Sequence, residues 1–117
     1  MVAYHTELTD AELDRLFRAL ADATRRDIVM RVLGGEPAPI SALAARYDMS
    51  FAAVQKHVAV LEEAGLVTKH RHGRERRVEG NPERLARARE LLAQLEEIWR
   101  DRFSRIDQLF TDPDTQE

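Results

Sequence analysis

Apolar positions recur at helical spacing through the first part of the chain, and capping residues divide them into separate helices. Thr9 and Glu12 form a capping box, which predicts a first helix from about Asp10 to Ala21. Asp22 is a suitable N-cap for a second helix, which the glycines at 34 and 35 would end. The apolar stripes are Leu13, Leu16, Phe17 and Leu20 in the first helix and Ile28, Val29, Val32 and Leu33 in the second.

Two shorter helices follow, joined by a short link. Pro39 can stand at or just before the first turn of a third helix, which runs to about Tyr47. Residues 48–50 form a three-residue link, and Ser50 is a good N-cap for a fourth helix that runs to Ala64. In this helix the spacing of the apolar side chains predicts which ones pack inward, namely Val54, Val58 and Leu61. The other faces carry mostly short side chains near the N-terminal end.

A β-hairpin is expected next. Strand propensity begins at Leu66 and closes at Val78, with residues 72–74 as the turn between two strands. The pattern as a whole predicts a mainly α fold with a small β-hairpin.

The last element is a long helix. Asn81 provides an N-cap and Pro82 suits the first helical position, which makes a strong helix start. No helix breaker occurs before Pro113, so the helix could extend about 28 residues or roughly 42 Å. We expect one domain over residues 1–117, with tails at 1–8 and 111–117 and the long helix at 81–110.

Composition narrows the class of protein. The chain has 117 residues, of which 44% are hydrophobic and 33% charged, as in a helix-rich globular domain. Cysteine is absent, which excludes disulfides, thiolate nucleophiles and thiolate zinc sites. The sequence has neither a secretory signal pattern nor an apolar run near the roughly 20 residues of a membrane span. A cytoplasmic protein without a membrane partner is therefore expected.

Charge is distributed unevenly along the chain. The net charge of −3 does not suggest a nucleic-acid partner. Residues 69–77 nevertheless hold five basic side chains and one acid, Glu75, around a single glycine. Such a run is often only a solvated face, but it also suits the closely spaced charges of a phosphate backbone or a narrow minor groove.

Two helices around a short turn, followed by a basic hairpin, are the elements that reading a DNA groove requires. The major groove is about 12 Å wide, so alanines on the outer face of the fourth helix permit close approach. Gln55 can bond an adenine edge, Lys56 can reach phosphate or guanine, and Ser50 with the helix amides can hold a phosphate. Double-stranded DNA is thus the predicted partner. The candidate contacts are Ser50, Ala52, Ala53, Gln55, Lys56, His57, Arg71, Arg74, Arg76 and Arg77.

Two alternatives remain open. The basic hairpin could meet an acidic protein surface, in a winged helix used for protein–protein contact. His70 and His72 share a strand face and, with His5, could form an atypical metal site with carboxylates. The absence of cysteine, and of histidine in the long helix, argues against a metal cofactor. No spacing indicates a nucleophile–base pair, a carboxylate dyad or a glycine-rich phosphate loop, so neither an enzyme nor a cofactor is expected.

The long helix carries an apolar stripe at near-heptad spacing. It consists of Leu85, Leu92, Leu95, Trp99, Ile106 and Leu109, widened by Leu91, Ile98, Phe103 and Phe110. A stripe of this width exceeds what one small body can cover, which predicts a homodimer. Two-fold symmetry would set two recognition helices about 34 Å apart and imply a near-palindromic DNA site.

The sequence resembles the ArsR (SmtB-like) family of winged helix-turn-helix transcriptional regulators. The resemblance runs through LFRALADATRRDIV (16–29), ISALAARYDMSFAAVQKHVAVLEEAGLV (40–67) and HRHGRERRV (70–78). It implies a dimeric repressor in which the fourth helix reads the operator and an inducing event releases it. The first and last helices would form the dimer interface, and the candidate residues are Leu13, Leu16, Leu92, Leu95, Trp99, Phe103 and Ile106.

The departures from the family pattern concern sensing and specificity. Pro39 and Ser41 stand where metal-sensing relatives carry a Cys-x-Cys pair, so the chain resembles the cysteine-free, non-metal branch, whose inducer the sequence does not identify. Gln55 replaces a common serine, which implies a different DNA specificity, and Val78 replaces a frequent aromatic residue in the hairpin.

Overall fold

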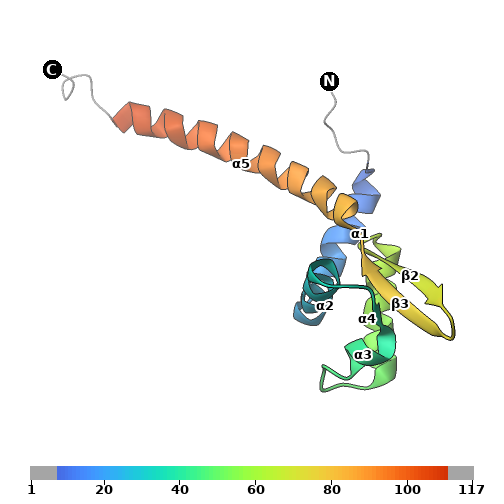
Figure 1. The fold of residues 1–117 in the computed structure, drawn as a ribbon. Helices are drawn as coiled ribbons and strands as arrows, with labels where there is room; N and C mark the ends of the chain where they lie inside the picture. The colour runs from blue at the N-terminus through green and yellow to red at the C-terminus, as the bar shows by residue number, and fades with distance from the viewer. Residues whose placement is uncertain (1–7, 111–117) are drawn as a thin grey trace.

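A computed structural model describes residues 8–110 of the chain (Figure 1). Helices dominate, and a β-hairpin connects α4 to α5, as the sequence predicts. The elements in chain order are α1 (Asp10–Leu20), α2 (Ala23–Gly34), β1 (Ala38–Pro39), α3 (Ile40–Ala44), α4 (Phe51–Glu63), β2 (Val67–His72), β3 (Glu75–Gly80) and α5 (Pro82–Phe110).

The predicted caps begin three of the helices. Thr9 Oγ1 accepts a hydrogen bond from the Glu12 amide at 3.1 Å, and Glu12 Oε1 accepts from the Thr9 amide at 2.9 Å. Asp22 Oδ2 accepts from the Arg25 amide at 3.0 Å to start α2, and the Ser50 hydroxyl caps α4. Such caps satisfy amide groups that have no partner inside the helix. They make the helix starts predictable from the sequence.

The third helix is shorter than predicted. It ends at Ala44 rather than Tyr47, so six residues, 45–50, separate it from α4 in place of the predicted three. Tyr47 lies beyond the helix end, where its hydroxyl donates to Asp27 Oδ2 of α2 at 2.6 Å. This bond joins residues 20 positions apart, so the apolar spacing within α3 could not predict it.

The sheet has three strands in the order β1-β3-β2, one more than predicted. The hairpin of β2 and β3 turns at Gly73, whose φ of +66° favours glycine. The added strand, β1, pairs Ala38 with Val78 and Pro39 with Arg77. With only two residues, one of them a proline, β1 has no recognisable strand pattern.

The core lies between α1, α2, α4 and the sheet. Its fully buried larger side chains are Leu16, Ile28, Val54, Val58, Leu61, Leu66, Val67 and Val78. Leu16 corrects a prediction, because its side chain is 0% exposed within a single chain and has no surface left for a partner. The apolar spacing of α1 showed that Leu16 is on the apolar face of the helix. It did not show whether that face packs on the core of its own chain or on a second subunit.

The start of α5 is fastened to the end of α4. Asn81 Nδ2 donates to the Gly65 carbonyl at 3.0 Å, and Arg84 Nε donates to the Ala64 carbonyl at 3.2 Å. A cation at a helix C-terminus also complements the helix dipole. These bonds set the direction in which α5 leaves the sheet.

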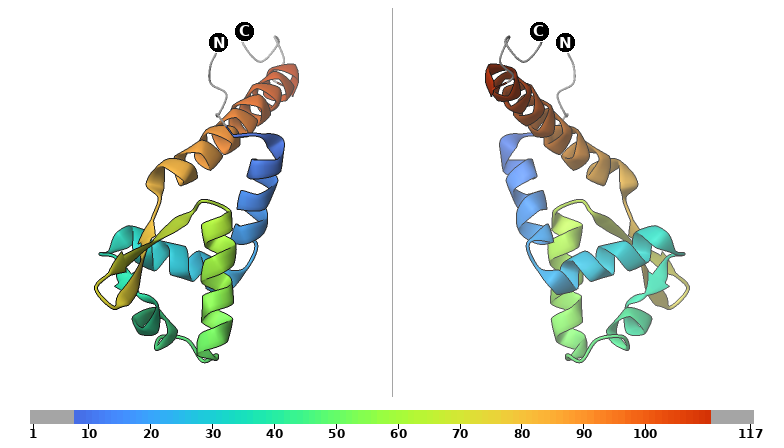
Figure 2. Two further views of the ribbon diagram at one scale, coloured as in Figure 1. Left: turned by 90° about the vertical axis from the view of Figure 1, so that its right-hand side faces the viewer. Right: turned by 90° about the vertical axis from the view of Figure 1, so that its left-hand side faces the viewer.

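Beyond this attachment α5 extends away from the rest of the molecule (Figures 1 and 2). We call residues 8–91 the head and residues 92–110 the arm; every residue of the arm is exposed. The molecule consequently measures 73 × 34 × 23 Å. Within residues 8–110, the helices are all too short or too polar to cross a bilayer.

Candidate nucleic-acid interface

Helix α4 presents one apolar face to the core and one polar, short-chain face to solvent. Val54, Val58 and Leu61 are fully buried, as predicted from their spacing. Ala52, Gln55, Lys56 and Ala59 are exposed, and Ala53 is half-buried. At the start of the helix, the Ser50 hydroxyl accepts from the Ala53 amide at 3.1 Å. The outer face of α4 therefore has the small profile that approach to a groove requires.

Phe51 is a feature of this face that the sequence analysis did not single out. It is the first residue of α4 and 47% exposed. Gln55 follows four residues later, so the two side chains lie one turn apart on the same side of the helix. The capping position of Ser50 was the signal available in the sequence, since it makes the next residue the helix start.

His57 differs from its predicted role. Its Nδ1 lies 3.4 Å from Arg25 Nη1 and 3.9 Å from Asp22 Oδ2, so the ring faces α2 rather than the outside. Arg25 also donates through Nε to the Ala19 carbonyl at 2.7 Å, at the end of α1. The hydrogen bonds to Asp22, first that from the Arg25 amide, lower the pKa of its carboxyl group. His57 thus belongs to the junction of α1, α2 and α4.

The two faces of the hairpin carry different charges. The register pairs Lys69 with Val78 and Arg71 with Arg76, and because side chains alternate along a strand, all four share the face that Val78 buries. The opposite face carries both acids of the hairpin. There Arg77 lies 3.4 Å from Glu75, and His70 lies 3.1 Å from Glu79.

The cationic side of the hairpin faces α4. A cleft of about 280 Å³ is lined by Phe51 and Gln55 of α4, by residues 39–41, and by Arg74, Glu75 and Arg76 of the hairpin. A neighbouring cleft is lined by Arg71 and Arg76, together with Lys69, whose Nζ lies 3.3 Å from Glu62. The structure brings Gln55, Arg74 and Arg76 to one place, while Arg77 lies on the other face and Lys69 already has an acidic partner.

The three histidines within residues 8–110 do not form a metal centre. His70 and His72 lie on the same face of β2, where His70 Nε2 contacts Thr68 Oγ1 at 3.0 Å and Glu79. No group of three or more metal-liganding side chains occurs within residues 8–110. His5, the third residue of the predicted site, lies outside the described residues.

Comparison with known proteins gives the family. A helix-turn-helix domain model matches residues 20–70. The chain is 38% identical over 86 residues to the HTH-type transcriptional regulator Rv2034 of Mycobacterium tuberculosis, covering 74% of this chain and 77% of that protein. It is 32% identical to the solved structure of an ArsR-like transcriptional regulator from Rhodococcus sp. RHA1, with a TM-score of 0.73 over 85% of this chain and 92% of the other. The chain belongs to the ArsR family.

The resemblance drawn from the sequence is therefore confirmed, and so is the winged helix-turn-helix fold. In this family member, α3 and α4 are the helix-turn-helix and β2 and β3 the wing. The protein is a DNA-binding transcriptional regulator, which belongs to a non-enzymatic class, in agreement with the sequence.

A more distant structure shares the fold alone. It is the homodimeric winged helix-turn-helix DNA-binding domain Mb0332 from Mycobacterium bovis, a possible ArsR-family regulator. The identity is 20% and the TM-score 0.59, over 85% of this chain and 94% of the other.

Proposed function

We propose that this ArsR-family regulator is a homodimeric repressor of a near-palindromic operator. In this proposal residues 1–117 act as one domain, in which the helix at 81–110 serves dimerisation. Each α4 enters a major groove while the hairpin tip lies against the adjacent backbone or minor groove. The observation that carries the proposal is the cleft shared by Gln55, Arg74 and Arg76. One rigid surface can thus offer base-reading and phosphate-binding groups together.

The geometry supports separate roles for the contacts. Gln55 is exposed on the outer face of α4, from which a carboxamide can bond bidentately to adenine. Lys56 can reach phosphate or guanine, and Ser50 with the first amides of α4 can hold a phosphate. The exposed or half-exposed alanines, 52, 53 and 59, keep the helix close to the groove. His57 has no part in this assignment, because it faces α2.

The arginines of the hairpin supply the sequence-independent part of binding. Arg71, Arg74 and Arg76 are exposed and lie on the side of α4 or in the turn. Facing phosphates, they would release counterions and so make the affinity depend on salt. Arg77 would first have to break its ion pair with Glu75 before it could bind a phosphate. We therefore assign Arg77 a smaller share.

The dimer is supported by the arm. Its large apolar side chains are between 41% and 81% exposed, and they include Leu92, Leu95, Ile98, Trp99, Phe103, Ile106, Leu109 and Phe110. A contiguous row of exposed apolar side chains of this kind is typical of a surface that binds another protein. The fold neighbour from Mycobacterium bovis is described as homodimeric. Leu13 of α1 is half-buried and can add to the same interface.

Two-fold symmetry gives the operator its form. Two copies of α4 related by a dyad would enter successive major grooves about 34 Å apart, on inverted half-sites. A dimer that covers both half-sites blocks access to the duplex between them, which is the basis for proposing repression. Transcription in vitro from a promoter that overlaps the selected operator should fall as the protein is added; a rise would identify an activator.

Operator selection from a random duplex library is the experiment that tests the proposal. Inverted half-sites should emerge, with centres about ten base pairs apart. Enriched sites without symmetry would contradict the two-fold arrangement. Failure of the folded protein to bind any duplex at low salt would contradict DNA recognition through this surface.

Two variants separate the roles of helix and hairpin on the selected operator. Arg74→Ala should weaken all sequences alike and reduce the slope of log K against log salt by about 0.9, the value for one phosphate contact. Gln55→Ala should instead relax preference at one base position by about 1–3 kcal/mol. Fluorescence anisotropy at four salt concentrations measures both. An unchanged slope for Arg74→Ala would remove the hairpin tip from the interface.

A further inference from the structure

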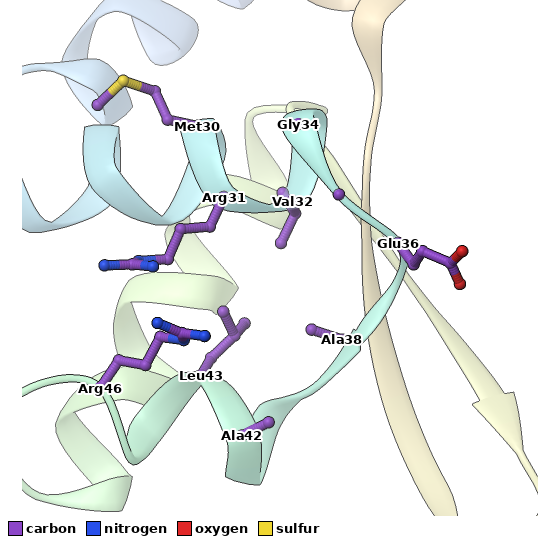
Figure 3. A pocket seen from close by; sticks show the side chains of 10 residues that line it. Met30, Arg31, Val32, Gly34, Glu36, Ala38, Ala42, Leu43 and Arg46 are labelled. Atoms are coloured by element: carbon purple, nitrogen blue, oxygen red, sulfur yellow. The ribbon is translucent and has the colours of Figure 1, made fainter.

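A second concave surface lies between α2 and α3, apart from the nucleic-acid interface (Figure 3). Its volume is about 400 Å³, within the range of small-molecule sites. The walls come from the end of α2, from the segment that includes Ala38 of β1, and from α3. None of these lining residues takes part in the proposed DNA contacts.

The inner part of this cleft is apolar. Val32 and Leu43 are almost completely buried in the core, and they line the cleft where α2 faces α3. Ala38 and Ala42 have short side chains, which leave the space open. An apolar group entering here would contact aliphatic carbon and displace water from it.

Two arginines give the cleft its charge. Arg31 and Arg46 extend along the same side of it, while Glu36 points away (Figure 3). Arg31 Nε donates to Asp27 Oδ2 at 2.9 Å, and the same oxygen accepts the Tyr47 hydroxyl. The hydrogen bonds from Tyr47 and Arg31 stabilise the ionised form of Asp27 and lower the pKa of its carboxyl group.

This arrangement leaves guanidinium groups available. The bond to Asp27 uses Nε of Arg31, and Tyr47 also hydrogen-bonds this side chain and helps to hold it in place. A guanidinium has five N–H donors, so further donors of Arg31 remain. The guanidinium of Arg46 makes no hydrogen bond or ion pair with another residue in the range 8–110, although its charge contributes to lowering the pKa of Asp27. Two cations therefore face one carboxylate, Asp27, beside an apolar recess.

We propose that the cleft between α2 and α3 binds a small organic monocarboxylate with an apolar body, of about the size of benzoate. Its carboxylate would accept hydrogen bonds from Arg46 and from the terminal nitrogens of Arg31, because a planar guanidinium matches the two oxygens of a carboxylate. Its ring would lie over Val32 and Leu43, between the two alanines.

Occupancy of this cleft has a route to the DNA-binding surface. Ala38 pairs with Val78 of the hairpin, and α3 leads through residues 45–50 into α4. A ligand that alters the separation of α2 and α3 would therefore move the hairpin and α4 relative to each other. This consequence rests on the proposed function, whereas binding of the carboxylate does not.

Methyl NMR on the full chain without DNA tests the proposal directly. Met30 lines the cleft and is largely exposed, whereas Met49 packs against the core elsewhere. Titration with benzoate at pH 7 and constant ionic strength should shift the Met30 methyl signal in a saturable way and leave Met49 little changed. Benzyl alcohol and benzylamine, which keep the ring without the carboxylate, should bind at least about tenfold more weakly.

Variants separate the charge from the recess. Arg46→Gln should weaken benzoate about tenfold, and Arg46→Lys should recover part of the loss, because it restores the charge without the planar fork. Ala42→Trp should fill the recess and prevent binding while both arginines remain. Arg100→Gln, on the arm, is the matched control and should bind benzoate as the wild type does.

Two results would overturn the proposal. The first is equal binding of benzoate and benzyl alcohol, and the second is wild-type benzoate affinity in Arg46→Gln or Ala42→Trp, each shown by circular dichroism to be folded. Titrating benzoate in the presence and absence of the selected operator tests the coupling. If benzoate lowers the affinity of the protein for DNA, DNA must lower the affinity for benzoate by the same factor. If the folded protein bound benzoate but no duplex at all, the proposed function would be contradicted and the benzoate result would stand.

Discussion

The head and the arm carry the same kind of apolar pattern, but only the head covers it. In α1, α2 and α4 the stripes meet one another and the sheet, so that Leu16, Ile28 and Val58 are completely buried. In the arm a stripe at near-heptad spacing is left in solvent, with Trp99 at 62% exposure and Phe103 at 60%. Their rings stack with centroids 6.2 Å apart and bury little surface by doing so.

The difference shows that one pattern can specify two levels of structure. A stripe on a short helix near other helices is covered by its own chain, because turns of a few residues return the partners to it. The arm extends in one direction from its attachment at Asn81 and Arg84, and residues 92–110 never return to the head. In the proposed dimer a second copy covers this stripe, so dimerisation and folding should respond to different substitutions.

The largest expected effect is on the arm. Trp99→Asp places a charge in the proposed interface once in each copy, which should weaken the dimer by about 4–8 kcal/mol in all. The head should remain folded, since Trp99 contributes nothing to its core. Sedimentation equilibrium measures the association, and circular dichroism checks the fold.

Arg100→Ala provides the control on the same helix. Arg100 pairs with Glu96 at 2.8 Å, but both side chains are more than half exposed. Such pairs contribute little, so this variant should stay dimeric. A dimer of unchanged strength in Trp99→Asp would contradict the assignment of the arm.

The next effect is on the head. Leu16→Ala should lower the free energy of unfolding by about 3–5 kcal/mol, because it removes a fully buried side chain and leaves a cavity. In the monomeric Trp99→Asp background, urea denaturation should give this loss independently of protein concentration. A much smaller loss would mean that α1 packs on the head less firmly than the structure indicates.

The smallest expected effect is on the loss of folding stability at acid pH. The Arg25 amide and neighbouring charges lower the pKa of Asp22 in the folded protein. A lowered pKa stabilises the fold above the carboxyl pKa of the unfolded chain, about 3.9, and that contribution is lost as the pH falls through the folded value. In the monomeric background, the urea midpoint of the wild-type head should therefore fall more steeply between pH 5 and pH 3 than that of Asp22→Asn.

The substitution Asp22→Asn keeps a side-chain oxygen for the cap and removes only the titration. If the urea midpoints of the two proteins depended on pH in the same way, Asp22 would not contribute to the loss of stability at acid pH. Glu12 and Asp27, whose pKa values are also lowered by hydrogen bonds, would then account for it.

The candidate site was predictable in its parts and less so in its arrangement. Burial of Val54, Val58 and Leu61 followed from spacing, so the exposure of Gln55 and Lys56 on α4 followed as well. The division of the hairpin arginines between two faces follows from strand register, which sequence alone left uncertain. The inward turn of His57 depends on Asp22 and Arg25, the latter 32 positions away, and no local pattern contains that contact.

The sequence by itself determined where the helices begin, which residues form their stripes and where the hairpin turns. Caps, 3.6-residue periodicity and glycine at positive φ act within a few neighbouring residues, so they can be recognised without a fold. Only the tertiary structure decided that α3 stops at Ala44, that β1 joins the sheet, that Leu16 belongs to the core and at which residue the exposed part of α5 begins. Each of these depends on which distant segments meet, and the free energy of such contacts belongs to the packed chain as a whole.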